Sequence, residues 1–240
     1  MPKHAGNRAP VSLDVTPSSL DHVALWVDRR EPMARFLCDH LGMHVIEETD
    51  TFTLVGVDAK LGKLTLFDAE GPRERGALDR VALRVNGLDA VLARFPDDVL
   101  VERGADGIAL LEAPGGLPLA LVEGGGPDFD LDHVLLRLPD AESALAGLAG
   151  MGFERRDGAL AVGDRELRVV TGDARDEGRP LLNHIALLVD SAEAVLRDAE
   201  TNGIVVDDVK DAPNTIAVFL RGPAGVRIEY VEHKPGFALV

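Results

Sequence analysis

The sequence predicts an α+β protein built from four strand–helix–strand–strand–strand (βαβββ) units that pair into two half-barrel domains. A phrase related to LDHVALWV begins at residues 20, 78, 131 and 182, and self-similarity at a period of roughly 50 residues marks a repeated supersecondary unit. A helical pattern and then three short apolar runs follow each phrase. We expect the units to pair, because a single unit leaves an open sheet edge.

The first unit shows the pattern most clearly. Residues 20–27 alternate and are rich in aliphatic and β-branched types, which is typical of a strand. Apolar residues at helical spacing predict a helix over 29–41, and Gly42 ends it. Three further strands are expected at 43–48, 51–57 and 61–67.

The other three units repeat this order of a strand, a helix and three strands. The second is predicted at 78–85, 87–95, 99–103, 107–112 and 117–122, the third at 131–138, 140–150, 153–156, 158–162 and 165–170, and the fourth at 183–189, 191–202, 204–209, 214–221 and 225–232. The helix of the third unit is rich in alanine and glycine, so we expect it to pack closely.

A glycine-rich segment divides the chain near its middle. Gly124-Gly125-Gly126-Pro127 is typical of a linker. The predicted organisation is an N-terminal arm (1–19), an N-terminal paired domain (20–124), a linker (125–130), a C-terminal paired domain (131–234) and a tail (235–240).

Composition limits the classes of partner. The net charge is −16, whereas nucleic-acid binding needs a basic face. No apolar run approaches the ~18–20 residues that span a bilayer, and the polar N-terminus lacks the apolar core of a signal peptide. The single cysteine, Cys38, excludes an internal disulfide and a CxxC zinc site. We expect a cytoplasmic protein that binds neither nucleic acid nor membranes.

The pattern resembles the vicinal oxygen chelate superfamily, which includes glyoxalase I, bleomycin-resistance proteins and type I extradiol dioxygenases. The resemblance covers about residues 20–233 and is carried by the repeated first strands, by Phe36 through Met43, and by the ending PAGVRIEY at 223–230. Gly222 and Val226 depart from the family's DPxGNxxEL ending. The resemblance implies a small-molecule substrate and is compatible with a homodimer. Because the superfamily hosts unrelated reactions, function depends on the site.

In this superfamily, metal ligands come from the third position of the first strand and from a glutamate on the last strand of a unit. The resemblance therefore implies His133, His184 and Glu229 as ligands in the C-terminal half. Two imidazoles and one carboxylate form the facial triad of non-haem Fe(II) sites, although Mn(II), Co(II), Ni(II) and Zn(II) accept the same ligands. The carboxylate position of the third unit matches Leu167, so three protein ligands are expected where glyoxalase-type sites have four. The alternative is that these histidines are buried structural residues.

The N-terminal half is predicted to hold no metal. Its third positions are His22 and Arg80, and its carboxylate positions match Leu66 and Ala120. A lone histidine beside an arginine is a poor cation site, so we expect His22 to be structural. Type I extradiol dioxygenases also have a metal-free N-terminal half.

The resemblance favours a dioxygenase-like oxidoreductase that binds two neighbouring oxygens of a small substrate, with Fe(II) as the preferred metal. The acid–base histidines and tyrosine of the extradiol pattern are missing, because Tyr230 is predicted on the opposite strand face and Phe219 stands where the family has tyrosine. Phe219 becomes a candidate substrate contact, and His233, four residues after Glu229, is the remaining catalytic candidate. The alternatives are a non-redox metal-dependent isomerase, epimerase or lyase, and a bleomycin-resistance-like binding protein. The aromatic content of 4% argues against the aromatic-lined cleft of such binding proteins.

Overall fold

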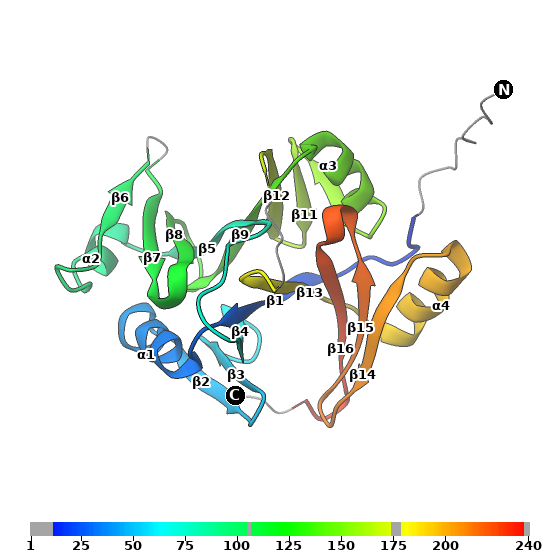
Figure 1. Cartoon of the computed structure of the whole chain (residues 1–240), viewed down its shortest axis with the longest axis horizontal. Helices are drawn as coiled ribbons and strands as arrows, with labels where there is room; N and C mark the ends of the chain where they lie inside the picture. Colours follow the sequence, from blue (N-terminus) through cyan, green and yellow to red (C-terminus); the bar gives the residue numbers. More distant parts are fainter. Residues whose placement is uncertain (1–11, 105–106, 174–178, 238–240) are drawn as a thin grey trace.

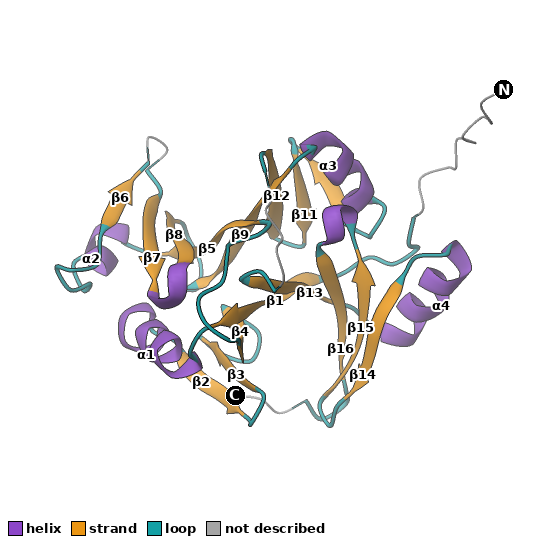
Figure 2. Cartoon of the chain, in the orientation of Figure 1, coloured by secondary structure: helices purple, strands orange, loops and turns teal. Residues whose placement is uncertain are grey.

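The computed structural model describes residues 12–104, 107–173 and 179–237. It confirms the α+β class and the βαβββ units, which form two eight-stranded sheets with helices on their outer faces (Figures 1 and 2). Residues 1–11 of the expected N-terminal arm and residues 238–240 of the expected tail lie outside the described residues. None of the helices in the described ranges is long and apolar enough to cross a membrane.

The units follow one another in the predicted order. The first contains β1 (Ser19–Val27), α1 (Arg30–Leu41), β2 (His44–Glu48), β3 (Phe52–Gly56) and β4 (Lys63–Asp68), and the second contains β5 (Leu78–Val85), α2 (Leu88–Leu92), β6 (Val101–Arg103), β7 (Ala109–Ala113) and β8 (Leu117–Glu123). The third contains β9 (Asp130–Leu138), α3 (Ala141–Ala149), β10 (Glu154–Arg156), β11 (Ala159–Val162) and β12 (Arg165–Thr171), and the fourth contains β13 (Leu182–Leu188), α4 (Ala192–Asn202), β14 (Val206–Asp211), β15 (Thr215–Arg221) and β16 (Arg227–His233).

Helix α2 is shorter than the predicted span 87–95. It ends at Leu92, and Pro96 follows three residues after its C-cap. A proline disfavours helical backbone in the residue before it, here Phe95, so the helix stops early.

The pairing of the units differs from the sequence prediction. One sheet has the strand order β14-β15-β16-β13-β1-β4-β3-β2 and joins the first unit to the fourth. The other has the order β10-β11-β12-β9-β5-β8-β7-β6 and joins the second unit to the third. The expected division into paired domains 20–124 and 131–234 is therefore wrong as a description of the sheets. The short connection 124–129 joins β8 to β9 within one sheet, whereas residues 69–77 lead from β4 in one sheet to β5 in the other.

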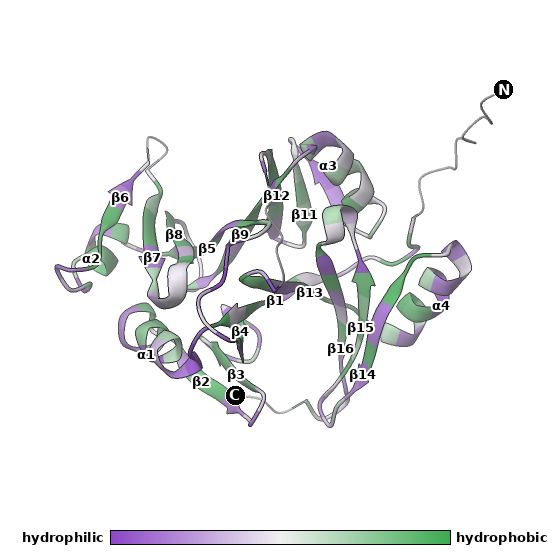
Figure 3. Ribbon diagram, viewed as in Figure 1, coloured by the Kyte–Doolittle hydropathy of each residue, from purple (hydrophilic) through white to green (hydrophobic). Residues whose placement is uncertain are grey.

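The helices cover one face of each sheet and leave the other face, the concave one, free of helices (Figure 1). Alternate residues of β1, such as Val23 and Leu25, belong to the main apolar core on the helix-covered side, and the apolar stretches of the strands stand out in green in Figure 3. Helix α3 packs as closely as its composition predicts, because a Cβ at Gly147 would lie 2.6 Å from Pro223 Cγ.

Tyr230 lies in this core, fully buried, and its hydroxyl donates a 2.6 Å hydrogen bond to the Met151 carbonyl. We expect the substitution Tyr230→Phe to lower the free energy of unfolding by about 1–2 kcal/mol, because the buried carbonyl loses its donor. Urea unfolding of both proteins measures this difference. An unchanged midpoint would show that the hydrogen bond contributes nothing.

Candidate metal centre

Three side chains with metal-binding groups meet on the concave face of the sheet that joins the first and fourth units. His22 lies on β1, His184 on β13 and Glu229 on β16, which are neighbouring strands. The Nε2 atoms of the two histidines are 3.2 Å apart. Glu229 Oε2 lies 3.2 Å from Nε2 of His22 and 2.7 Å from Nε2 of His184. The structure thus brings His184 and Glu229 together, as the sequence predicts, but their neighbour is His22.

A β-bulge precedes each of these histidines. The pairing of β1 with β13 shifts register just before His22 and just before His184, at Asp21 and Asn183. A bulge re-aims a side chain that strict alternation would send to the other face. As a result, His22 Nδ1 lies 2.9 Å from Asp21 Oδ2, and His184 Nδ1 lies 3.0 Å from Asn183 Oδ1.

These contacts determine which ring nitrogen is free to bind a metal. The amide oxygen of Asn183 only accepts hydrogen bonds, so His184 Nδ1 carries the hydrogen and donates it. The lone pair on Nε2 of His184 then points toward His22 Nε2 and Glu229 Oε2. The Asp21 carboxylate orients His22 in the same way. A metal-binding histidine usually donates the N–H of its other ring nitrogen to an oxygen acceptor in this way.

Burial and charge shape the titration of the three groups. Burial alone lowers the pKa of His22, but the Glu229 and Asp21 carboxylates outweigh it and raise this pKa to about 9. Burial also lowers the pKa of His184, and there it prevails over the attraction of Glu229. For Glu229, burial raises the pKa, but His184 and His22 hold it well below its usual range. At neutral pH the metal-free group therefore keeps an ionised carboxylate beside one cationic and one neutral imidazole.

Metal affinity is expected to increase with pH up to about 9. The raised pKa of His22 means that a metal ion must displace a proton below that value, so one proton is released and affinity rises by up to about tenfold per pH unit. Competition with a chromophoric chelator at several pH values measures the slope. A flat profile between about pH 6 and 9 would contradict the binding of metal through His22.

The distances fit a single small cation. Two ligands at ~2.1 Å from one ion and at right angles are ~3 Å apart, and the three separations between the ligand atoms lie between 2.7 and 3.2 Å. Each of the three ligand atoms lies next to the other two, as in a facial arrangement, in which three ligands occupy one face of the metal's coordination sphere. Among the described residues, His22, His184 and Glu229 form the one group of this composition.

Strand register identifies the first-unit position that matches Glu229. Glu229 pairs with Ala186 on the neighbouring parallel strand, and the equivalent pair in the first unit is Ala24 with Thr65. The sequence-based assignment to Leu66 is thus wrong by one residue. Thr65 is buried and has no carboxylate, so the group offers three strong ligands.

A network of charged side chains that the sequence analysis missed is joined to His22 through Asp21. Asp21 is buried and accepts hydrogen bonds from Lys63 Nζ at 2.8 Å and from His233 Nε2 at 3.2 Å. Although burial raises the pKa of Asp21, His22, His233 and Lys63 hold it well below its usual range. His233 also stacks on Phe237 with 3.8 Å between ring centroids. His233 therefore contacts Asp21, the residue that holds the His22 imidazole.

Three aromatic side chains lie near the group. Phe219 meets the His184 ring edge-on at 5.2 Å between centroids, and Phe67 lies 6.3 Å from the same ring. Trp26 contacts Phe67 at 5.3 Å. The low overall aromatic content therefore does not exclude aromatic side chains beside this group. Tyr230 points into the core, on the strand face opposite Glu229, as the sequence predicts.

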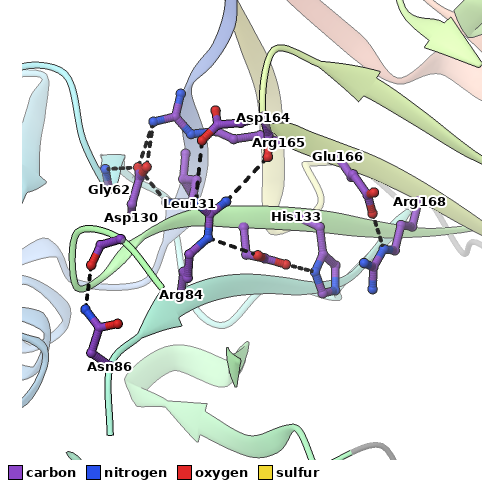
Figure 4. Close-up of polar contacts among 12 residues, drawn as sticks. Gly62, Arg84, Asn86, Asp130, Leu131, His133, Asp164, Arg165, Glu166 and Arg168 are labelled. Atoms are coloured by element: carbon purple, nitrogen blue, oxygen red, sulfur yellow. Dashed lines mark hydrogen bonds and ion pairs between the residues drawn. The ribbon is translucent and has the colours of Figure 1, made fainter. Parts of the chain in front are cut away.

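His133, the third predicted ligand, lies in the other sheet on β9. Its side chain is fully buried, and its Nδ1 donates a 2.8 Å hydrogen bond to Asp132, which Arg84 also contacts (Figure 4). Its Nε2 has no hydrogen-bond partner within the described part of the chain. His133 is therefore not a neighbour of His184, because the third unit pairs with the second.

The register also corrects the carboxylate position of the third unit. Leu135, the counterpart of Ala186, pairs with Arg168, so Leu167 is off by one residue. In the second unit, Ala82 pairs with Ala120, as predicted. The face around His133 thus carries Arg168 where the other sheet has Glu229, and a cation there would meet positive charge.

Comparison with known proteins places the chain in a family. A family model described as the Glyoxalase/Bleomycin resistance protein/Dioxygenase superfamily matches residues 19–230. No curated protein matches the sequence.

Solved structures share the fold at low sequence identity. A putative dioxygenase from Bacillus subtilis is 19% identical with a TM-score of 0.72, and the match covers 93% of this chain and 88% of that one. Glyoxalase I from Zea mays is 16% identical with a TM-score of 0.71, and the match covers 89% and 92%. The cppA protein from Streptococcus pneumoniae is 16% identical with a TM-score of 0.63, covering 91% and 100%. The match of the family model over most of the chain establishes that this protein belongs to the glyoxalase/bleomycin resistance protein/dioxygenase superfamily.

Proposed function

We propose that His22, His184 and Glu229 bind one divalent metal ion and that the protein is a metal-dependent, dioxygenase-like oxidoreductase with Fe(II) as its preferred metal. The observation that carries the proposal is the convergence of two imidazole Nε2 atoms and one carboxylate oxygen to within 2.7–3.2 Å of one another. The arrangement of this buried carboxylate with two oriented imidazoles matches the ligand set of non-haem Fe(II) sites.

The ligand count favours a centre with open positions. Thr65 stands where a second carboxylate would complete a four-ligand site, so three protein ligands leave room for two neighbouring oxygens of a small substrate. When bound, a metal of this kind polarises such oxygens or activates O2.

The chain's own residues orient and shield this centre. Asp21 and Asn183 hold the two imidazole rings by their Nδ1 atoms. Phe219 and Phe67 pack against His184 and exclude water from one side of it. His233, the catalytic candidate from the sequence, supports Asp21, so we assign it a positioning role.

Anaerobic reconstitution with Fe(II) tests the proposal. The protein is stripped with chelator, loaded with Fe(II) and freed of excess, and iron per chain is measured before oxygen uptake is followed with a panel of catechols and 2-oxo acids. We expect one retained iron per chain and metal-dependent oxygen uptake. A wild-type protein that retains no more iron than the His184→Ala variant would contradict the metal centre. Retained metal without oxygen uptake would favour the non-redox isomerase, epimerase or lyase.

A further inference from the structure

We propose that a pocket beside the metal centre binds an anionic group, a carboxylate in the first instance, on the substrate whose neighbouring oxygens reach the metal. The proposal rests on the proposed function for the position of those oxygens. The pocket has a volume of about 270 Å³, and its polar and aromatic walls come from Trp26, Arg179, Asn183, Asp207, Arg221 and Arg227.

Three sets of contacts connect this pocket with the centre. Arg227 stacks over Phe219 at 4.0 Å, and Phe219 meets the His184 ring at 5.2 Å. Trp26, which also lines the pocket, contacts Phe67, and Phe67 lies beside His184. Asn183 lines the pocket and also holds His184 Nδ1. A molecule bound in the pocket would therefore lie next to His184, one of the three residues proposed to bind the metal.

The charge of the lining is opposite to that of the chain. Three arginines face one carboxylate, Asp207, in a protein whose net charge is −16. Asp207 accepts hydrogen bonds from Arg221 at 2.8 Å and from Arg227 at 2.6 Å, and Asp208 lies 3.8 Å from Arg227. Arg179 has no carboxylate partner within the described ranges. The pocket thus keeps positive charge that these two aspartates do not balance.

The arginines are also held in place. The Arg179 guanidinium stacks over the Trp26 ring at 4.7 Å, as Arg227 does over Phe219. A stacked guanidinium keeps its N–H donors at its edge, where they match the two oxygens of a carboxylate. The aromatic faces beside these donors suit a planar or apolar body. A small planar substrate with an acidic group satisfies both features.

Binding of matched ligands tests this pocket without relying on turnover. Catechol, 3,4-dihydroxybenzoate and 3,4-dihydroxyphenyl phosphate share one ring and differ in the anionic group. Affinity is measured by anaerobic calorimetry on metal-loaded and on metal-free protein. Trp26 is the only tryptophan of the chain and lines the pocket, so its emission, corrected for ligand absorbance, reports where the ligand binds.

We expect 3,4-dihydroxybenzoate to bind at least about tenfold more tightly than catechol and to change the Trp26 emission. The Arg179→Gln variant should lose most of this preference while its catechol affinity stays unchanged. Arg168→Gln, which removes the same charge from the other sheet, is the control and should keep the preference. A phosphate that binds more tightly than the carboxylate would overturn the assignment to a carboxylate.

Any one of three results would overturn the pocket proposal. They are equal affinity for catechol and 3,4-dihydroxybenzoate, a preference that survives in Arg179→Gln, and the absence of binding by 3,4-dihydroxybenzoate. Metal content distinguishes this failure from that of the proposed function. A protein that retains metal but shows no preference contradicts the pocket alone. A protein that shows the preference but retains no metal contradicts the centre alone.

Discussion

Replacing Glu229 by alanine is expected to lower the affinity for divalent metal by more than about 100-fold, because even outer partners of metal ligands contribute 10–100-fold and Glu229 supplies the only carboxylate of the described group. The two imidazoles that remain would also lose the charge that attracts a cation. Competition with a chromophoric chelator measures the affinity of the purified variant.

Glu166 provides a matched control for this substitution. It is a carboxylate on β12 of the other sheet, where it pairs with Arg168 at 2.7 Å (Figure 4). Glu166→Ala removes the same charge from the chain and should leave metal affinity unchanged. If both variants lost affinity equally, the effect would be one of net charge and not of ligation.

The largest effect on stability is expected at Arg165. Its guanidinium donates two 2.8 Å hydrogen bonds to Asp130 (Figure 4). It also donates one of 3.2 Å to the Leu20 carbonyl. Asp130 also accepts from the Gly62 amide at 3.2 Å. Arg165 and Asp130 lie in one sheet and Leu20 in the other, so this buried pair connects the two sheets.

We expect Arg165→Met to lower the free energy of unfolding by about 3–5 kcal/mol, because Asp130 would keep a buried charge without its partner. Arg168→Met, which breaks the half-exposed pair with Glu166, is the control and should cost no more than about 1 kcal/mol. Chemical unfolding of both variants measures the two values. A cost for Arg165→Met as small as that of the control would show that the buried pair does not hold the sheets together.

The repeat in the sequence was enough to predict the units, because each phrase begins a strand and each strand has a helix after it. It was not enough to predict their partners. The four first strands are nearly alike, so local pattern does not say which edges pair, and that choice depends on long-range contacts such as Arg165 with the Leu20 carbonyl. The pairing of the first unit with the fourth is what brings His22 to His184.

His133 shows why the ligand set could be predicted only in part. It occupies the same place in its phrase as His184, and its Nδ1 is held by the preceding residue, as in His22. What differs is the surrounding sheet, which places Arg80 and Arg168 at the positions equivalent to His22 and Glu229. The roles of Asp21 and Asn183 were also hidden, because they depend on β-bulges that strict strand alternation does not predict.

The metal content of two histidine variants tests the central claim, that the first and fourth units form the centre. His22→Ala and His133→Ala are loaded with Fe(II) under identical anaerobic conditions, and retained iron per chain is measured. The structure predicts that His22→Ala loses the metal and that His133→Ala keeps one iron per chain. Loss of metal in His133→Ala with retention in His22→Ala would contradict the account.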